Sequence, residues 1–306
     1  METLTFILSG TLIAATPLLI AALGELAAEK SGVLNLSIEG MMSLGAVAAF
    51  IVVKNTGDYW LGIFVGGAAA TLLAALFAVI VLFLLGNQVA SGLAVGILGG
   101  GMAALIGKSY ESATVPPMPS SPIPILSHAP IVGRGLFDHV LLVYLAPAAA
   151  VLMWWIFRFT KTGLILRSTG ESPEITHTLG YNVLAVRFLA ILFGGFMAGI
   201  AGAFISIASA TLWSDGLIAG RGWIVVALVV FGAWRAERVA LGAYLFGAAT
   251  IGQLLVQSIG VEVPSQLLTS VPYIATIVAI ALLSMDGKRI RLNAPVSLGR
   301  VYREAH

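Results

Sequence analysis

The chain has 306 residues, of which 59% are hydrophobic and only 10% charged, and its mean hydropathy is +1.01. Soluble domains carry about 25% charged residues, so this chain cannot cover a water-facing surface with polar groups, and its solvent must be lipid. The net charge of +2 comes without a basic stripe typical of nucleic-acid binding, and the absence of cysteine excludes disulfides, thiolate metal sites and thiol nucleophiles.

Nine apolar runs are candidates for membrane spans. They cover residues 5–24, 33–53, 59–85, 88–107, 139–157, 185–208, 217–234, 239–259 and 271–285. A helical span needs about 20 residues, so several runs are marginal and are expected to be broken or tilted. The sequence predicts an all-α, polytopic membrane helix bundle of about nine spans, with residues 1–306 as a single transmembrane domain. The first run lacks the basic start of a signal peptide and is expected to be retained.

Lysine and arginine gather in the loop between the fifth and sixth runs and in the tail, 286–306. They are Arg158, Lys161, Arg167 and Arg187 in the loop, and Lys288, Arg289, Arg291, Arg300 and Arg303 in the tail. Cytoplasmic loops are enriched in these residues, so both stretches are expected to be cytoplasmic. Alternating crossings then place the N-terminus, 109–138 and 209–216 outside, and 234–238 inside.

Three charged residues, Glu25, Glu29 and Lys30, interrupt the apolar pattern early in the chain. Ionisable groups at membrane depth are costly and usually face a polar interior. Two interpretations stay open for these residues: an ordinary cytoplasmic loop, which we favour, or a polar surface inside the bundle.

The stretch that follows has a clearer pattern. Asn35, Ser37 and Glu39 alternate with apolar residues between Gly32 and Gly40, which is typical of a broken span. We therefore expect Asn35, Ser37 and Glu39 to line a translocation pathway.

Several glycines are spaced so that helices could approach closely. The pairs Gly62 and Gly66, Gly96 and Gly100, and Gly195 and Gly199 each have three residues between them. Together they indicate a tight bundle of many helices.

The fourth run begins with Asn87 and Gln88, which are either a polar cap at the interface or part of the pathway. The stretch from Gly101 to Ser109 resembles a phosphate-binding loop, but its glycines have the wrong spacing and no strand precedes it. We therefore expect no nucleotide or other cofactor on this chain. The proline-rich segment 109–138 is expected to be an external loop or a plug.

The loop from 160 to 187 contains the signals of a short helix. Ser172 is a good N-cap, Pro173 fits the first helical position, Glu174 favours the positive end of the helix dipole, and Gly180 is a typical C-terminal glycine. These signals predict a helix over 173–179. Isolated helices need about 12 residues to be stable in water, so this helix must pack against something.

Aromatic and charged residues gather again in 211–223, which includes Arg221 and Trp223. Tryptophan favours membrane interfaces, so one interpretation is an aromatic belt. The alternative is that Arg221 and Trp223 stack on, or hydrogen-bond to, a planar ring or hydroxyl groups of a substrate.

The 160–187 loop resembles the cytoplasmic loop of permease subunits in bacterial ABC importers of the ribose, branched-chain amino acid and nucleoside class. The shared positions are Gly163, Arg167, Gly170, Glu171, Pro173, Glu174, Leu179, Gly180, Asn182 and Val183. The stretch from Ser31 to Met42, G-R-G-W at 220–223, and V-P-S-Q at 263–266 resemble the nucleoside branch of this family. The resemblance implies a type II-importer-like bundle in which a coupling loop, about 160–184, contacts the ATP-hydrolysing subunit.

The resemblance carries further expectations. The residues expected to couple to the ATPase are Glu171, Ser172, Pro173, Glu174, Ile175, Leu179 and Gly180. Those expected to line the pathway are Asn35, Ser37, Glu39, Asn87, Gln88, Arg221 and Trp223. The implied partners are a second, paralogous permease chain, a cytoplasmic ATP-binding subunit that uses the ATP, and an extracytoplasmic solute-binding protein.

The implied substrates are nucleosides, purines or related sugar-containing solutes, taken up across the bacterial plasma membrane. The alternatives are a secondary transporter or channel that acts without an ATPase, and a membrane enzyme. No histidine–carboxylate cluster or nucleophile motif supports an enzyme. A solitary carrier has no need of a structured cytoplasmic loop, so we favour the importer permease.

Overall fold

A computed structural model describes residues 2–123, 133–258, 270, 271, 274, 278 and 294–303. The helices in these residues are α1 (Glu2–Lys30), α2 (Ile38–Thr56), α3 (Tyr59–Ala78), the π-helical η1 (Val79–Phe83), α4 (Gln88–Gly107), the 3₁₀-helical η2 (Lys108–Tyr110), α5 (Gly133–Phe137), α6 (Leu141–Phe159), α7 (Lys161–Glu171), α8 (Pro173–Thr178), α9 (Val183–Phe204), the π-helical η4 (Ile205–Ser209), α10 (Arg221–Phe231) and α11 (Ala236–Ser258). The expected all-α class is confirmed for this part of the chain.

Within the described residues, seven helices are long and apolar enough to cross a membrane. They correspond to α1, α2, α3 with η1, α4 with η2, α6, α9 with η4, and α11. The predicted count of about nine spans is therefore not confirmed. The 217–234 run contains only the 11-residue α10, too short to cross alone. Most of the 271–285 run, and the motif at 263–266, lie outside the described residues.

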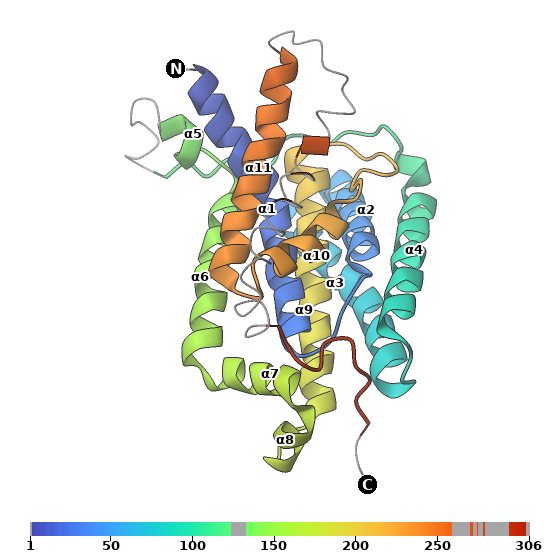
Figure 1. The fold of residues 1–306 in the computed structure, drawn as a ribbon. Coiled ribbons are helices and arrows are strands. Elements are labelled where there is room, and N and C mark those ends of the chain that lie inside the picture. Colours follow the sequence, from blue (N-terminus) through green and yellow to red (C-terminus); the bar gives the residue numbers. More distant parts are fainter. Residues whose placement is uncertain are drawn as a thin grey trace.

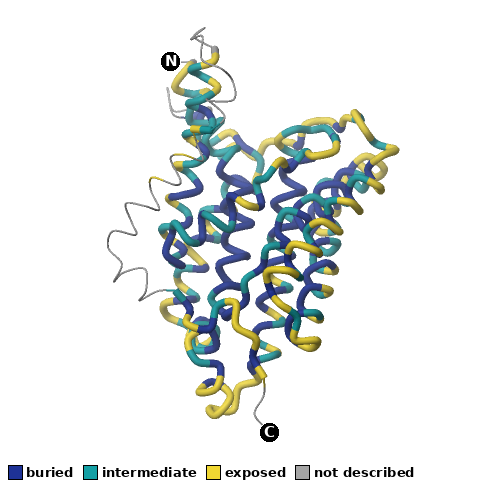
Figure 2. Tube along the Cα trace, turned by 45° about the vertical axis from the view of Figure 1, so that its right-hand side comes forward, coloured by how far each residue is buried: buried dark blue, intermediate teal, exposed yellow. Residues whose placement is uncertain are grey.

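The core of the bundle is built from α1, α2, α3 and α9, which pack closely on one another. Figure 2 shows the buried residues along the centre of the bundle, with exposed positions at its ends and on outer helices. Glycine permits the closest approaches. A Cβ on Gly199 would lie 2.4 Å from the carbonyl oxygen of Gly66, and one on Gly202 only 1.9 Å from that of Met42. Since neither oxygen can move freely, the contacts require glycine.

The predicted glycine pairs have different environments. Gly62, Gly66, Gly195 and Gly199 all lie against neighbouring helices more closely than a side chain would permit. In the remaining pair, a Cβ on Gly96 would make an ordinary contact at 3.4 Å, and one on Gly100 would meet nothing within 4 Å. The interpretation of close helix approach is therefore wrong for Gly100.

The two ends of the bundle are distinct. Figure 1 places the N-terminus at the upper end, and α7, α8 and the C-terminal segment 294–303 at the lower end. The lower-end grouping agrees with the prediction that the 158–187 loop and the tail share one side. Two helices lie where only loops were expected: α7 within the 160–172 segment and α5 within 109–138. Residues 124–132 of that second loop, like 279–293 and 304–306, lie outside the described residues.

Candidate functional site

The charged end of α1 lies inside the bundle. Glu25 and Glu29 are helical and buried, so the favoured interpretation of a cytoplasmic loop is wrong. The backbone N–H of Asn35 donates to Glu25 Oε1 at 3.2 Å, and the indole N–H of Trp234 donates to Glu29. Buried carboxyl groups need such donors, and here one of them lies 205 residues away in the sequence.

The first broken span begins after α1. Residues 33–35 carry no helix, and α2 begins only at Ile38, so the 33–53 run is helical over its later part alone. Asn35 and Ser37 are fully buried, and the Asn35 side-chain oxygen accepts hydrogen bonds from the Ser37 N–H, at 3.0 Å, and the Ser37 hydroxyl. The two side chains thus hold the bend before α2, as an Asx turn does.

The predicted 217–234 run is the second broken span, and its helix α10 begins in contact with the start of α2. After η4 the chain runs from 210 to 220 without helix, through Gly220 in the left-handed region, at φ 80°, and then forms α10. One oxygen of the Glu39 carboxylate accepts from Gly220 N–H and the other from Gly222 N–H, both at 2.7 Å. A Cβ on Gly222 would lie 2.5 Å from the Glu39 backbone nitrogen.

Glu39 therefore connects the two broken spans. It lies in the first turn of α2, and its carboxylate binds the backbone N–H groups at the start of α10. A negative charge near a helix N-terminus is favourable, and this carboxylate serves two such ends at once. Since α2 and α10 begin inside the molecule, this contact joins the starts of the two helices.

The remaining predicted pathway residues divide into two groups. Arg221 lines a cavity of about 390 Å³ bounded by α1, η4, α10 and α11, and its Nη1 donates to the Leu217 carbonyl at 2.9 Å. Gln88 is buried beside the first broken span, where its Oε1 accepts from Leu34 N–H at 2.8 Å. Asn87 and Trp223, by contrast, are exposed. Asn87 caps α4 through Ala90 N–H, which agrees with the polar-cap interpretation.

The predicted short helix is confirmed as α8. Pro173 and Thr176 are buried against the bundle, while Ile175 is 62% and Leu179 67% exposed. The predicted Ser172 side-chain cap is wrong, because the hydroxyl makes no bond to the helix N–H groups and instead lies 3.4 Å from Glu174. Glu171 and Glu174 are exposed, and Gly180, at φ 88°, turns the chain toward α9.

A hydrogen-bonded group that the sequence did not predict, formed by Ser297, Gly170 and Arg187, ties this end together. Ser297 donates from its hydroxyl to the Gly170 carbonyl at 2.7 Å and accepts from Arg187 Nη2 at 2.9 Å. The buried Arg187 also donates from Nε to the Ser31 carbonyl at 3.0 Å. The C-terminal segment thus links α7 to α1 and α9. In the sequence, Arg187 stood out only as a loop cation and Gly170 only as a position shared with the family, and nothing placed Ser297 beside them.

The described residues contain no cluster of three or more His, Asp or Glu side chains placed to hold a metal ion. The site consists instead of two broken spans joined by a carboxylate and an exposed helix fixed to the lower end of the bundle.

Comparisons with known proteins agree on one family. The profile described as "Branched-chain amino acid transport system / permease component" matches residues 7–286. The putative glucose ABC transporter permease protein TsgC13 of Haloferax volcanii is 38% identical over 97% of each chain. The nucleoside permease NupC of Lactococcus lactis is 31% identical over 92% of this chain and 93% of its own. The guanosine permease NupQ of Bacillus subtilis is 31% identical over 98% and 97%.

Two further matches come from organisms already represented. The glucose permease TsgB13 of Haloferax volcanii is 24% identical over 82% of this chain, and the guanosine permease NupP of Bacillus subtilis is 30% identical over 37%. No solved structure matches the chain.

Proposed function

The chain belongs to the permease family of branched-chain amino acid transport systems, and from this premise we propose that it moves nucleosides or related sugar-containing solutes. As an ABC transporter permease it is a multi-pass membrane protein and a transport component rather than an enzyme. The substrate class is supported by relatives named for glucose, nucleosides and guanosine. ATP would be used by a separate subunit.

The geometry of α8 is the observation that supports a role in coupling to the ATPase. One edge of this helix, with Pro173 and Thr176, is buried, and the other presents Ile175 and Leu179 to the outside. The exposed edge is apolar and has Glu171 and Glu174 beside it, which suits a groove with an apolar floor and basic rim on an ATPase. Pro173 begins the helix, Gly180 turns the chain after it, and Ser172 precedes it without a side-chain cap bond.

A displacement of α8 would be transmitted directly to the helices that form the pathway. The chain continues from α8 through a short turn into α9, which packs on α1, α2 and α3. The hydrogen bonds of Ser297 and Arg187 supply a second connection, from α7 to α1. ATP-driven closure of the partner subunits would therefore tilt the packed bundle between outward- and inward-open states, as in type II importers.

The pathway is proposed to follow the two broken spans. Asn35, Ser37 and Gln88 line the first, Glu39 joins the first to the second, and Arg221 faces the cavity at the start of α10. The exposed residues Asn87 and Trp223 are proposed to contribute where two permease chains meet. Unwound backbone beside helix N-termini at mid-membrane is a common way of building solute sites in transporters.

A second permease chain is the proposed partner at this interface. TsgB13 and TsgC13 are named as glucose permeases of one organism, and NupP and NupQ as guanosine permeases of another. This pairing of names supports a heterodimer. An extracytoplasmic binding protein would deliver the solute, and a cytoplasmic ATP-binding subunit would supply the energy.

Orientation is also proposed, with the N-terminus outside and the tail in the cytoplasm of a bacterial cell. The chain lacks cysteine, so single cysteines can be labelled without background. Ser120→Cys, on an exposed stretch, is expected to react with an impermeant thiol reagent applied to intact cells. Val296→Cys, which is 57% exposed at the other end, is expected to react only after lysis. The reverse pattern would contradict this orientation.

Uptake into proteoliposomes tests the function itself. The chain would be reconstituted with its paralogous permease, its ATPase and its binding protein, and supplied with radiolabelled guanosine, adenosine, glucose or leucine. We expect ATP-dependent uptake of a nucleoside or the sugar, and none of leucine. Equal uptake without the ATPase would favour the alternative of a secondary transporter, and uptake of leucine alone would contradict the proposed substrate class.

A further inference from the structure

A second cavity of about 310 Å³ lies at the lower end of the bundle, away from the proposed pathway. It lies between the ends of α1 and α6, the middle of α7 and the turn before α11. The side chains that line it are Lys30, Trp154, Phe157, Arg158, Arg167, Trp234, Arg235, Ala236 and Glu237. A water takes up about 30 Å³ in the liquid, so the cavity has room for a phosphate group with several waters.

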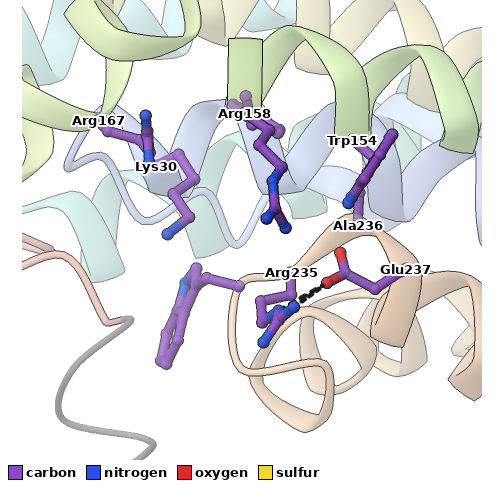
Figure 3. A pocket seen from close by; sticks show the side chains of 9 residues that line it. Lys30, Trp154, Arg158, Arg167, Arg235, Ala236 and Glu237 are labelled. Carbon is purple, nitrogen blue, oxygen red and sulfur yellow. Dashed lines mark hydrogen bonds and ion pairs between the residues drawn. The ribbon is translucent and has the colours of Figure 1, made fainter.

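The charge of this cavity is strongly one-sided. Four of its lining side chains are cationic and only one, Glu237, is acidic. In Figure 3 the ends of Lys30 and Arg158 point into the same space, with Arg235 and its partner Glu237 on the far side. Glu171 also interacts electrostatically with Lys30. Lys30, Arg158 and Arg235, which come from three separate elements, thus converge on one hollow, and this favours an anionic occupant.

The position of the cavity matches the headgroup level of a membrane. Trp154 and Arg158 lie in the last turns of α6, which is a candidate span. On the same turns Trp155 is 50% and Phe159 62% exposed, and both are suited to lipid contact. Tryptophan beside arginine at the end of a span is typical of the interface between hydrocarbon and headgroups. The Arg158 guanidinium lies 5.9 Å from the centre of the Trp154 ring, which orients it there.

We propose that this cavity binds the phosphate of an anionic phospholipid headgroup. Basic pockets between membrane helices near the cytoplasmic surface bind such groups through charge-assisted hydrogen bonds. The acyl chains would lie along the exposed apolar turns of α6. A bound lipid would connect α6 and α7 to the α10–α11 turn, and so brace the base of the second broken span. This inference does not depend on the transported solute.

The test uses the purified chain in detergent and native mass spectrometry. The probes are dioleoylphosphatidylglycerol, dioleoylphosphatidylcholine and inorganic phosphate. The variant is Arg158→Gln with Arg235→Gln, which removes two converging cations near the surface. The matched control is Arg300→Gln with Arg303→Gln, which removes two exposed arginines from the same end of the bundle. Arg158→Gln alone serves as a milder second variant.

We expect the wild type and the control to retain phosphatidylglycerol in preference to phosphatidylcholine. Affinity should fall about fivefold for each cation removed, so the double variant should lose about 25-fold. Equal retention by the double variant and the control would overturn the proposal, as would binding of inorganic phosphate without phosphatidylglycerol.

Discussion

Replacing Glu39 with glutamine tests the idea that one carboxylate joins the two broken spans. Both carboxylate oxygens accept backbone N–H groups of α10, each at 2.7 Å. A glutamine keeps the shape but offers one oxygen, so one N–H would face the amide NH₂ and lose its acceptor. A hydrogen bond to a charged group contributes about 1.5–3 kcal/mol, and the lost charge removes about 0.3–1 kcal/mol of favourable interaction at each helix end. We therefore expect Glu39→Gln to lower the free energy of unfolding by about 2–5 kcal/mol.

The assay is equilibrium unfolding in mixed detergent micelles, followed by tryptophan fluorescence. Glu237→Gln is the control, because Glu237 is a 40% exposed carboxylate paired with Arg235, and such surface pairs contribute about 0–1 kcal/mol. If Glu39→Gln and Glu237→Gln unfold alike, Glu39 does not hold the broken spans together. Transport by the Glu39 variant should fall in parallel with its stability, while the chain still inserts in the membrane.

Two further predictions concern packing and capping. Gly202→Ala would place a methyl group 1.9 Å from a backbone oxygen and should destabilise the bundle by about 1–3 kcal/mol. Gly100→Ala, with nothing within 4 Å, should be neutral or slightly stabilising. Equal free energies of unfolding for the two variants would refute the packing argument. Asn182 caps α9 by accepting from Ala185 N–H at 2.8 Å, so Asn182→Ala should lower the free energy of unfolding by about 1 kcal/mol. Ser172→Ala should change it little, because the Ser172 side chain makes no cap bond. A larger loss of stability for Ser172→Ala than for Asn182→Ala would contradict the structure.

Local signals predicted the local features of this protein well. The helix α8 follows from Pro173 at its first position and Gly180 after its end, since both residues have strong backbone preferences. The bend before α2 follows from the alternation of Asn35, Ser37 and Glu39. The helix α7 was missed because its sequence is polar and contains two glycines, although Thr160 caps it through Gly163 N–H.

The connections between distant segments could not be predicted from one sequence. Glu39 accepts hydrogen bonds from Gly220 and Gly222, which lie 181 and 183 positions later in the sequence. The donor to Glu29, Trp234, lies 205 positions later. Several short apolar runs, 217–234 among them, were expected to be broken, but the contact that joins this run to α2 depends on the remote carboxylate of Glu39. The importance of Ser297 likewise depends on Gly170 and Arg187, more than 100 residues earlier.

The most direct test of the account is whether α8 recruits the ATPase. Glu174→Lys with Ile175→Asp reverses one charge and places another on the exposed apolar edge of α8. Burying an unpaired charge in an interface costs about 2–5 kcal/mol, or roughly 30-fold to more than 1000-fold in affinity. The control, Asp138→Lys with Leu141→Asp, makes the same exchange at exposed positions on the opposite end.

The measurement is co-purification of the ATPase from membranes, with uptake recorded in parallel. We predict that the α8 variant inserts normally but neither retains the ATPase nor transports, while the control does both. An α8 variant that recruits the ATPase and transports at the wild-type rate would show that α8 is not the coupling element.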